Sequence, residues 1–223
     1  MDALYSLVSF YPAGTTDEQL DQYIEHHIAS VVKCVDNELF SSAYSHLHLL
    51  YMVFIYVQLL RIAKEKEQEF EYGWIGFPGQ EKDFLKKPTS PFSFSPVQER
   101  TVFRFFRLVG FDDGSIGNIS SVVDTRNKRL HASGQLHCAT IDEFESELNG
   151  YTDKMRSIVE KQAAFLNNIY EELLELYDEG YEFTADDLES NFIDQYLFSE
   201  YELALIAKGK NDLASKFIQA NYP

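Results

Sequence analysis

The stretch LHLLYMVFIYVQLL at residues 47–60 decides the fold class, because it is apolar on nearly every face of a helix. A helix that is apolar all round packs inside a protein, since it has no polar face to turn toward water. Its 14 residues include His48 and Gln58, and they are too few to cross a bilayer. We therefore predict a buried core helix over about residues 42–68, in an all-α protein without a membrane partner.

Helix signals surround this stretch, whereas strand signals are scarce. A capping box at Thr16–Gln19 predicts a helix that runs to about Phe40. A kink is expected at Gly150, within the helix that starts at Thr140–Glu143. Further helix starts are predicted at Ser95–Gln98, at Asp113 or Ser115, at Thr140–Glu143, at Thr184–Asp187 and at Ser199–Glu202.

Composition changes twice along the chain. Residues 72–95 are rich in Gly, Pro and aromatic side chains, which predicts a long ordered insertion within the helical bundle. Residues 181–223 are acidic and contain short helical patterns. We expect residues 1–180 to form the bundle and residues 181–223 to form a C-terminal helical appendage.

The charge of the chain is large and unevenly distributed. With 36 acidic and 19 basic residues the formal net charge is −17, which excludes a protein that coats nucleic acid with its whole surface. Residues 140–223 hold 19 acidic and 6 basic side chains, whereas residues 82–129 hold nine basic and five acidic ones. This cationic segment suits a localised RNA or anion site. The alternative is that Arg100, Arg104 and Arg107 form the solvated face of an amphipathic helix.

Two cysteines, Cys34 and Cys138, do not make a disulfide scaffold. The first basic residue is Lys33, so the chain shows no cationic signal-peptide start, and we expect a cytoplasmic protein.

Motifs for metals and cofactors are absent from the sequence, including Glu-x-x-His, His-Glu-x-x-His, Cys-x-x-Cys and the phosphate-binding glycine loops. The apolar helices carry His26, His27, His46 and His48. We interpret these four as core or interface histidines, because carboxylate and cysteine co-ligands are lacking. No metal and no cofactor is predicted.

One string carries chemistry: RNKRLH at residues 126–131, in which His131 follows Arg126 by five positions. An imidazole can take the proton of an RNA 2′-hydroxyl or protonate the leaving 5′-oxygen. A guanidinium can bind the phosphate oxygens as charge builds up. Five helical steps rotate the side chain by about 140°. The two residues therefore meet if Arg126 reaches around, if the helix loosens toward Gly134, or if a second chain completes the site.

This Arg-x4-His string, with a polar residue directly after the Arg and a mostly helical setting, resembles the active-site motif of HEPN-domain ribonucleases. The resemblance covers about residues 37–180. It implies a HEPN-like helical bundle and a metal-independent endoribonuclease, acting as a toxin or an abortive-infection effector in antiviral defence. It also implies a homodimer with a composite active site, and it allows an antitoxin or another regulatory protein as partner.

The resemblance assigns roles to particular residues. Arg126 and His131 are the expected catalytic residues, and Asn127 would orient His131 or bind a phosphate oxygen. The expected RNA-binding residues are Lys128, Arg129, Arg104 and Arg107. The chain departs from the family at Ser133, where toxins silenced by a partner nucleotidyltransferase often carry Tyr.

Two other functions are compatible with the sequence. The chain could be a non-catalytic helical interaction module that binds a partner protein or a nucleotide through residues 72–95 or the acidic tail. Arg126 and His131 would then be cations that complement the end of a helix dipole. Alternatively, the tail could mimic nucleic acid or screen the cationic segment.

Overall fold

The computed structural model describes residues 2–12, 17–73, 75, 77, 79–130, 138–178, 189–210 and 213–221. Within these residues the chain is helical, and its only β feature is an isolated bridge between Pro12 and Ser199. The all-α prediction is therefore confirmed. The chain forms two compact units, which we call the core unit (Gln19–Met155) and the terminal unit (Met1–Glu18 with Arg156–Pro223). The boundary predicted at residue 180 falls outside the described residues.

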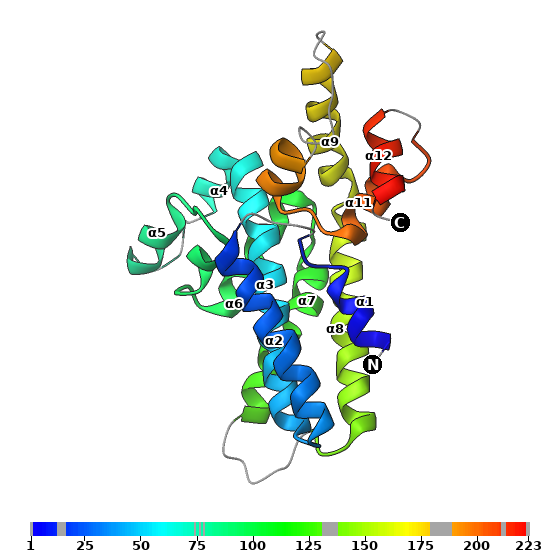
Figure 1. Ribbon diagram of the computed structural model, residues 1–223. Coiled ribbons are helices and arrows are strands. Elements are labelled where there is room, and N and C mark those ends of the chain that lie inside the picture. Colours follow the sequence, from blue (N-terminus) through cyan, green and yellow to red (C-terminus); the bar gives the residue numbers. More distant parts are fainter. Residues whose placement is uncertain are drawn as a thin grey trace. The chain divides into compact units, whose positions relative to one another are not determined.

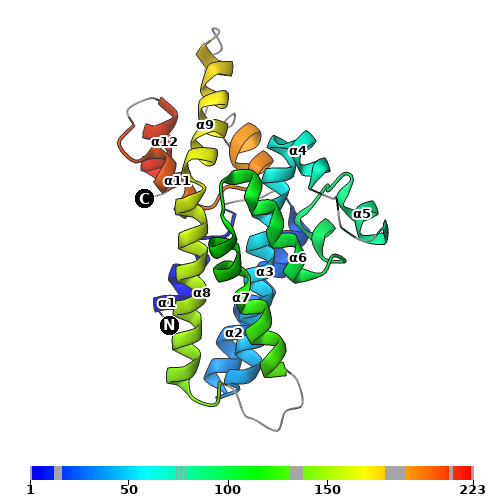
Figure 2. The same cartoon turned by 180° about the vertical axis from the view of Figure 1, so that it is seen from behind.

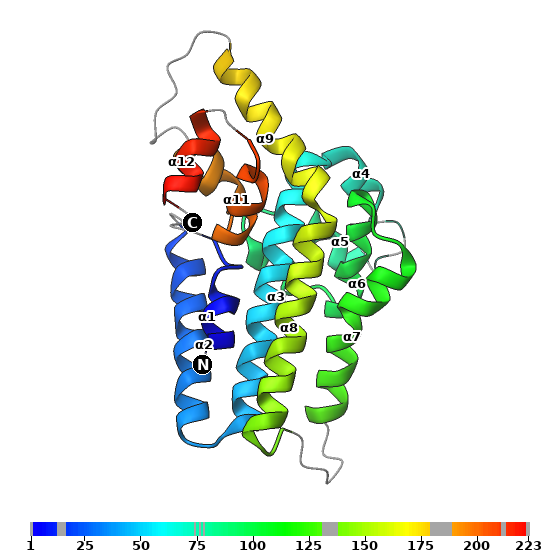
Figure 3. The same cartoon turned by 90° about the vertical axis from the view of Figure 1, so that its right-hand side faces the viewer.

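The core unit is organised around one long helix (Figure 1). Its elements are α2 (Glu18–Asp36), α3 (Phe40–Glu65), α4 (Glu67–Tyr72), α5 (Gly79–Leu85), η1 (Pro91–Phe94), α6 (Glu99–Val102), η2 (Phe103–Val109), α7 (Asp113–Leu130) and α8 (Ile141–Lys161). α3 packs against η1, η2, α4 and α7, and α7 and α8 run alongside it (Figures 2 and 3).

α3 is the buried helix predicted from its sequence. Every side chain from Leu50 to Ala63 is buried, including Gln58 and Arg61. By length and composition alone α3 could cross a membrane, but 89% of its most apolar window is buried inside the protein. The burial follows from the lack of a polar face.

Several described side chains of the segment 72–95 are packed into the core unit. It contains α5 and η1, and Phe77, Leu85 and Phe94 are buried. Phe105 of η2 stacks on Phe70, with ring centroids 4.1 Å apart, and on Phe77 at 5.6 Å. These contacts join the start of the segment to the helices on either side.

Helix starts and breaks differ from the sequence prediction in two places. The helix expected to begin at Ser95–Gln98 begins at Glu99 and tightens into the 3-10 helix η2, which ends at Gly110 with φ +88°. α8 continues through Gly150, and the chain breaks instead at Gln162, before α9 (Ala163–Asp178). A glycine inside a helix weakens it without having to bend it, because neighbouring packing holds the helix straight. The predicted caps at Thr16 and Thr184 lie outside the described residues.

The terminal unit contains α1 (Asp2–Val8), α9, η3 (Glu189–Asp194), α11 (Glu200–Ala207) and α12 (Leu213–Asn221). The capping box predicted at Ser199 is present: the Glu202 amide donates to Ser199 Oγ at 3.3 Å, and the Ser199 amide donates to the Glu202 carboxylate at 3.0 Å. α11 packs on α9 and α12, and Lys210 Nζ donates to Glu171 at 2.6 Å.

Candidate functional site

The last two turns of α7 carry four of the predicted site residues. Arg126 and Arg129, three positions apart, share the helix face that turns into the core unit, and their side chains are 25% and 22% exposed. Asn127 and Lys128 lie on the exposed face. His131 lies outside the described residues, so the structure describes only Arg126 of the predicted Arg126–His131 pair.

Arg126 is held by a carboxylate that sequence analysis did not single out. Its Nη2 donates to Oε2 of Glu99, the first residue of α6, and the same oxygen lies 3.3 Å from His48 Nε2. Burial raises the pKa of Glu99, but the hydrogen bonds and charges of His48 and Arg126 outweigh it and leave that pKa below its usual value. Glu99 is therefore ionised at neutral pH.

His48 is buried in α3 and connects Glu99 to two tyrosines. Its Nδ1 lies 3.1 Å from Tyr151 Oη, and Tyr151 Oη lies 3.4 Å from Tyr44 Oη. When His48 is neutral with its proton on Nε2, Tyr151 donates to Nδ1. When His48 is an imidazolium, Nδ1–H donates to Tyr151, whose hydroxyl then donates to Tyr44. The Tyr151 hydroxyl can therefore either donate to or accept from Nδ1 of His48, depending on which ring nitrogen carries hydrogen.

Arg129 is bound at the other end of this chain of polar contacts, next to Tyr44. Its Nη2 donates to Glu147 Oε1 at 2.6 Å, and its guanidinium carbon lies 4.8 Å from the centroid of the Tyr44 ring. Burial acts to lower the pKa of Arg129, but the hydrogen bond and charge of Glu147 outweigh burial and raise it. Burial is also the main cause of the raised pKa of Tyr151.

These contacts form one continuous polar network across α3, α6, α7 and α8, which we call the Arg126 network. Its members are Arg126, Glu99, His48, Tyr151, Tyr44, Arg129 and Glu147. Two buried donors, Arg126 Nε and Arg129 Nη1, have no hydrogen-bond partner among the described residues. Because both nitrogen atoms are buried, an anionic group from solvent could reach them only after a local movement.

The structure does not bring all predicted RNA-binding residues together. Arg107 is exposed and pairs with Asp113, the first residue of α7, about 20 Å of helix away from Arg126. Arg104 is exposed, and its guanidinium carbon lies 5.9 Å from the Phe77 ring centroid. Within the cationic segment, Arg107 and Arg126 therefore lie toward opposite ends of α7.

A weak signal for the missed residues is present in the sequence. Tyr44 with His48, and Glu147 with Tyr151, are pairs four positions apart on helices whose other inward residues are mostly apolar. Such a pair points both polar groups to one helix face. Glu99 is a carboxylate inside the cationic segment, and a carboxylate in that position predicts an ion pair within the protein.

Metal binding has no ready site in the described part of the chain, where no group of three or more His, Cys, Asp or Glu side chains could hold an ion. The sequence matches no family model, no curated protein and no solved structure to which it was compared.

Proposed function

We propose that the protein is a metal-independent endoribonuclease of the HEPN type, in which Arg126 binds the scissile phosphate and His131 transfers the proton. The observation that supports this proposal is the ion pair between Arg126 and Glu99. A guanidinium fixed by a carboxylate that is itself bound to His48 has lost its rotational freedom before any ligand arrives.

Arg126 retains donors for a phosphate. A guanidinium has five N–H groups, the contact to Glu99 uses one of them, and the Arg126 side chain is 25% exposed. Asn127 and Lys128 are exposed beside it and can contact a phosphate oxygen or attract RNA. Preorganised donors of this kind stabilise the charge that builds up on a phosphoryl group in the transition state.

In the proposed reaction the RNA 2′-hydroxyl attacks the adjacent phosphorus, and the bond from phosphorus to the 5′-oxygen breaks. An imidazole takes the 2′ proton or gives one to the leaving 5′-oxygen, so the products are a 2′,3′-cyclic phosphate and a 5′-hydroxyl. We expect a homodimer with a composite site, acting in the cytoplasm as a toxin or abortive-infection effector, with an antitoxin as a possible partner.

The test is RNA cleavage by the purified protein in EDTA, with the product ends identified by mass spectrometry. We expect cyclic phosphate ends and a loss of about a hundredfold or more in rate for His131→Ala. His137→Ala is the matched control, because it removes a histidine outside the motif and should keep the activity. Equal cleavage by His131→Ala and the wild type would contradict the proposal.

The same carboxylate contact also fits a second candidate, a non-catalytic interaction module. Arg126 and Arg129 are both paired with internal carboxylates, as cations with a purely structural role would be. Tyr72 and Ile75, which are 72% and 79% exposed, would supply an apolar contact surface for a partner protein. In that case no RNA is cut, and Arg126→Ala lowers the melting temperature without changing any RNA-dependent signal.

A further inference from the structure

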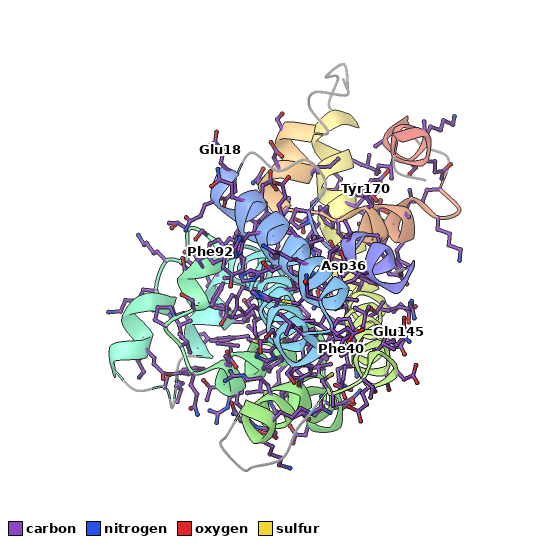
Figure 4. The ribbon with its side chains drawn as sticks, turned by 60° about the horizontal axis from the view of Figure 1, so that its bottom comes forward. Glu18, Asp36, Phe40, Phe92, Glu145 and Tyr170 are labelled. Atoms are coloured by element: carbon purple, nitrogen blue, oxygen red, sulfur yellow. The ribbon has the colours of Figure 1, made fainter. Side chains whose placement is uncertain are left out.

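Three histidines gather between two neighbouring helices of the core unit. α2 and α3 lie side by side (Figures 1 and 3), and Asp36 and Phe40 mark the turn between them (Figure 4). The ring centroid of His27 lies 5.1 Å from that of His26 and 5.1 Å from that of His46. The remaining pair, His26 and His46, is 6.4 Å apart. We call these three residues the histidine cluster.

The closest contact in the histidine cluster restricts its protonation. His27 Nδ1 and His46 Nδ1 lie 2.8 Å apart, which is a hydrogen bond when one nitrogen carries a proton and the other offers its lone pair. If both rings are imidazolium ions, two N–H groups face each other and two positive charges repel. The contact between α2 and α3 therefore tolerates one added proton but not two.

The ion pairs of the described residues offer nothing that offsets this repulsion. Among the described residues, no carboxylate forms an ion pair with any member of the histidine cluster. The other titratable group packed against His27 is Tyr23, whose ring centroid is 4.3 Å away and which also contacts Phe92 of η1 at 5.1 Å. Tyr23 stays neutral in acid, so it cannot balance charged imidazoles.

We propose that the histidine cluster is an acid-sensitive contact that holds α2 on α3 at neutral pH and releases it when the imidazoles become charged. Release would uncover the apolar face of α2, which now buries Leu20, Ile24 and Val31. The protein would thereby expose an apolar helix face in acid that it hides at neutral pH. This inference is independent of the proposed ribonuclease activity.

The pH window follows from the burial of His27. Burial lowers its pKa from 6.5 to about 4, and the charges of His46 and His26 act in the same direction. The released state binds more protons than the closed state between these values. The stabilisation of the α2–α3 contact is therefore complete above about pH 6.5 and is lost as the pH falls toward 4. Over this range the opening equilibrium constant rises by up to tenfold per pH unit for each histidine whose pKa is lowered.

Hydrogen exchange of the whole chain at pH 7 and pH 5, corrected for intrinsic exchange rates, tests the proposal. We expect α2 amides to lose at least tenfold in protection, while α8 amides of the core unit keep theirs. His27→Asn places an amide at the Nδ1 position, where it can bond to His46 without titrating, and should abolish the loss. His137→Asn, which removes a histidine outside α2 and α3, should retain it.

Two results would overturn the proposal: α2 and α8 losing protection equally, or His27→Asn showing the same loss as the wild type. If His27→Asn does not fold, an NMR titration of the wild-type histidines replaces it. The proposal requires His27 to titrate below its ordinary value of 6.5 in the closed state. Titration at or above that value with α2 still protected would refute it.

Discussion

His46 and His48 are two residues apart on α3, yet they meet opposite electrostatic surroundings. His48 lies between the Glu99 carboxylate and the Tyr151 hydroxyl, so a proton on its ring meets a negative charge. His46 faces the ring of His27, so a proton there meets other imidazoles. The comparison shows that the partner group, rather than the helix that carries the histidine, determines which charges each imidazole faces.

Helix geometry explains how neighbours on one element reach such different partners. Two helical steps rotate a side chain by about 200°, so positions 46 and 48 point to opposite sides of α3. One side faces α2 and its histidines, and the other faces α6 and α8. α3 thereby connects the Arg126 network to the histidine cluster.

The largest expected effect comes from replacing His48, and the same replacement at His46 tests the comparison directly. His48→Asn keeps a polar group near Tyr151 but takes the imidazole away from the half-buried Glu99, and should lower the free energy of unfolding by about 2–3 kcal/mol. The matched change His46→Asn keeps the bond to His27 and should cost less than about 0.5 kcal/mol at pH 7.5. Urea unfolding of both variants measures this, and equal losses would show that the two surroundings do not differ.

Next in size is the removal of the Glu99 charge. Glu99→Gln keeps the shape but weakens two charge-assisted hydrogen bonds, and should cost about 1–2 kcal/mol at pH 7. Because the pKa of Glu99 is lowered in the folded protein, its stabilisation is present above the unfolded value and is lost as the pH falls through the folded one. The gap between wild type and variant should therefore shrink below about pH 4. A gap that widens in acid contradicts the assignment.

A smaller change tests the Tyr151 hydroxyl, which lies between His48 and Tyr44. Tyr151→Phe removes the partner of both His48 and Tyr44 but keeps the buried ring, and should cost about 1 kcal/mol. Thermal unfolding measures the loss. Tyr72→Phe, at a side chain that is 72% exposed, is the control and should leave the melting temperature unchanged.

The smallest effect on stability is expected outside both clusters. Lys128→Ala changes an exposed side chain of α7 and should shift the free energy of unfolding by less than about 0.5 kcal/mol. If the chain cleaves RNA, the same variant should bind RNA more weakly and with a shallower salt dependence. A filter-binding series at several salt concentrations separates these two expectations.

Sequence patterns predicted the helices better than the site. The Ser199 capping box and the buried run in α3 are confirmed, because caps and apolar periodicity are local properties of a helix. The kink predicted at Gly150 was wrong, because α8 continues through this residue. The break at Gln162 had no local signal in the sequence. Packing against neighbours overrides the preference of a single residue.

By itself the sequence determined an all-α protein with a buried central helix and a divided charge, since composition and periodicity are carried by neighbouring residues. Only the tertiary structure decided that Glu99 meets both His48 and Arg126, and that His27 meets His46. It also separated Arg107 from Arg126 along α7. The reason is physical: contacts between residues tens of positions apart depend on how helices are packed, and helix packing follows from many side chains acting together.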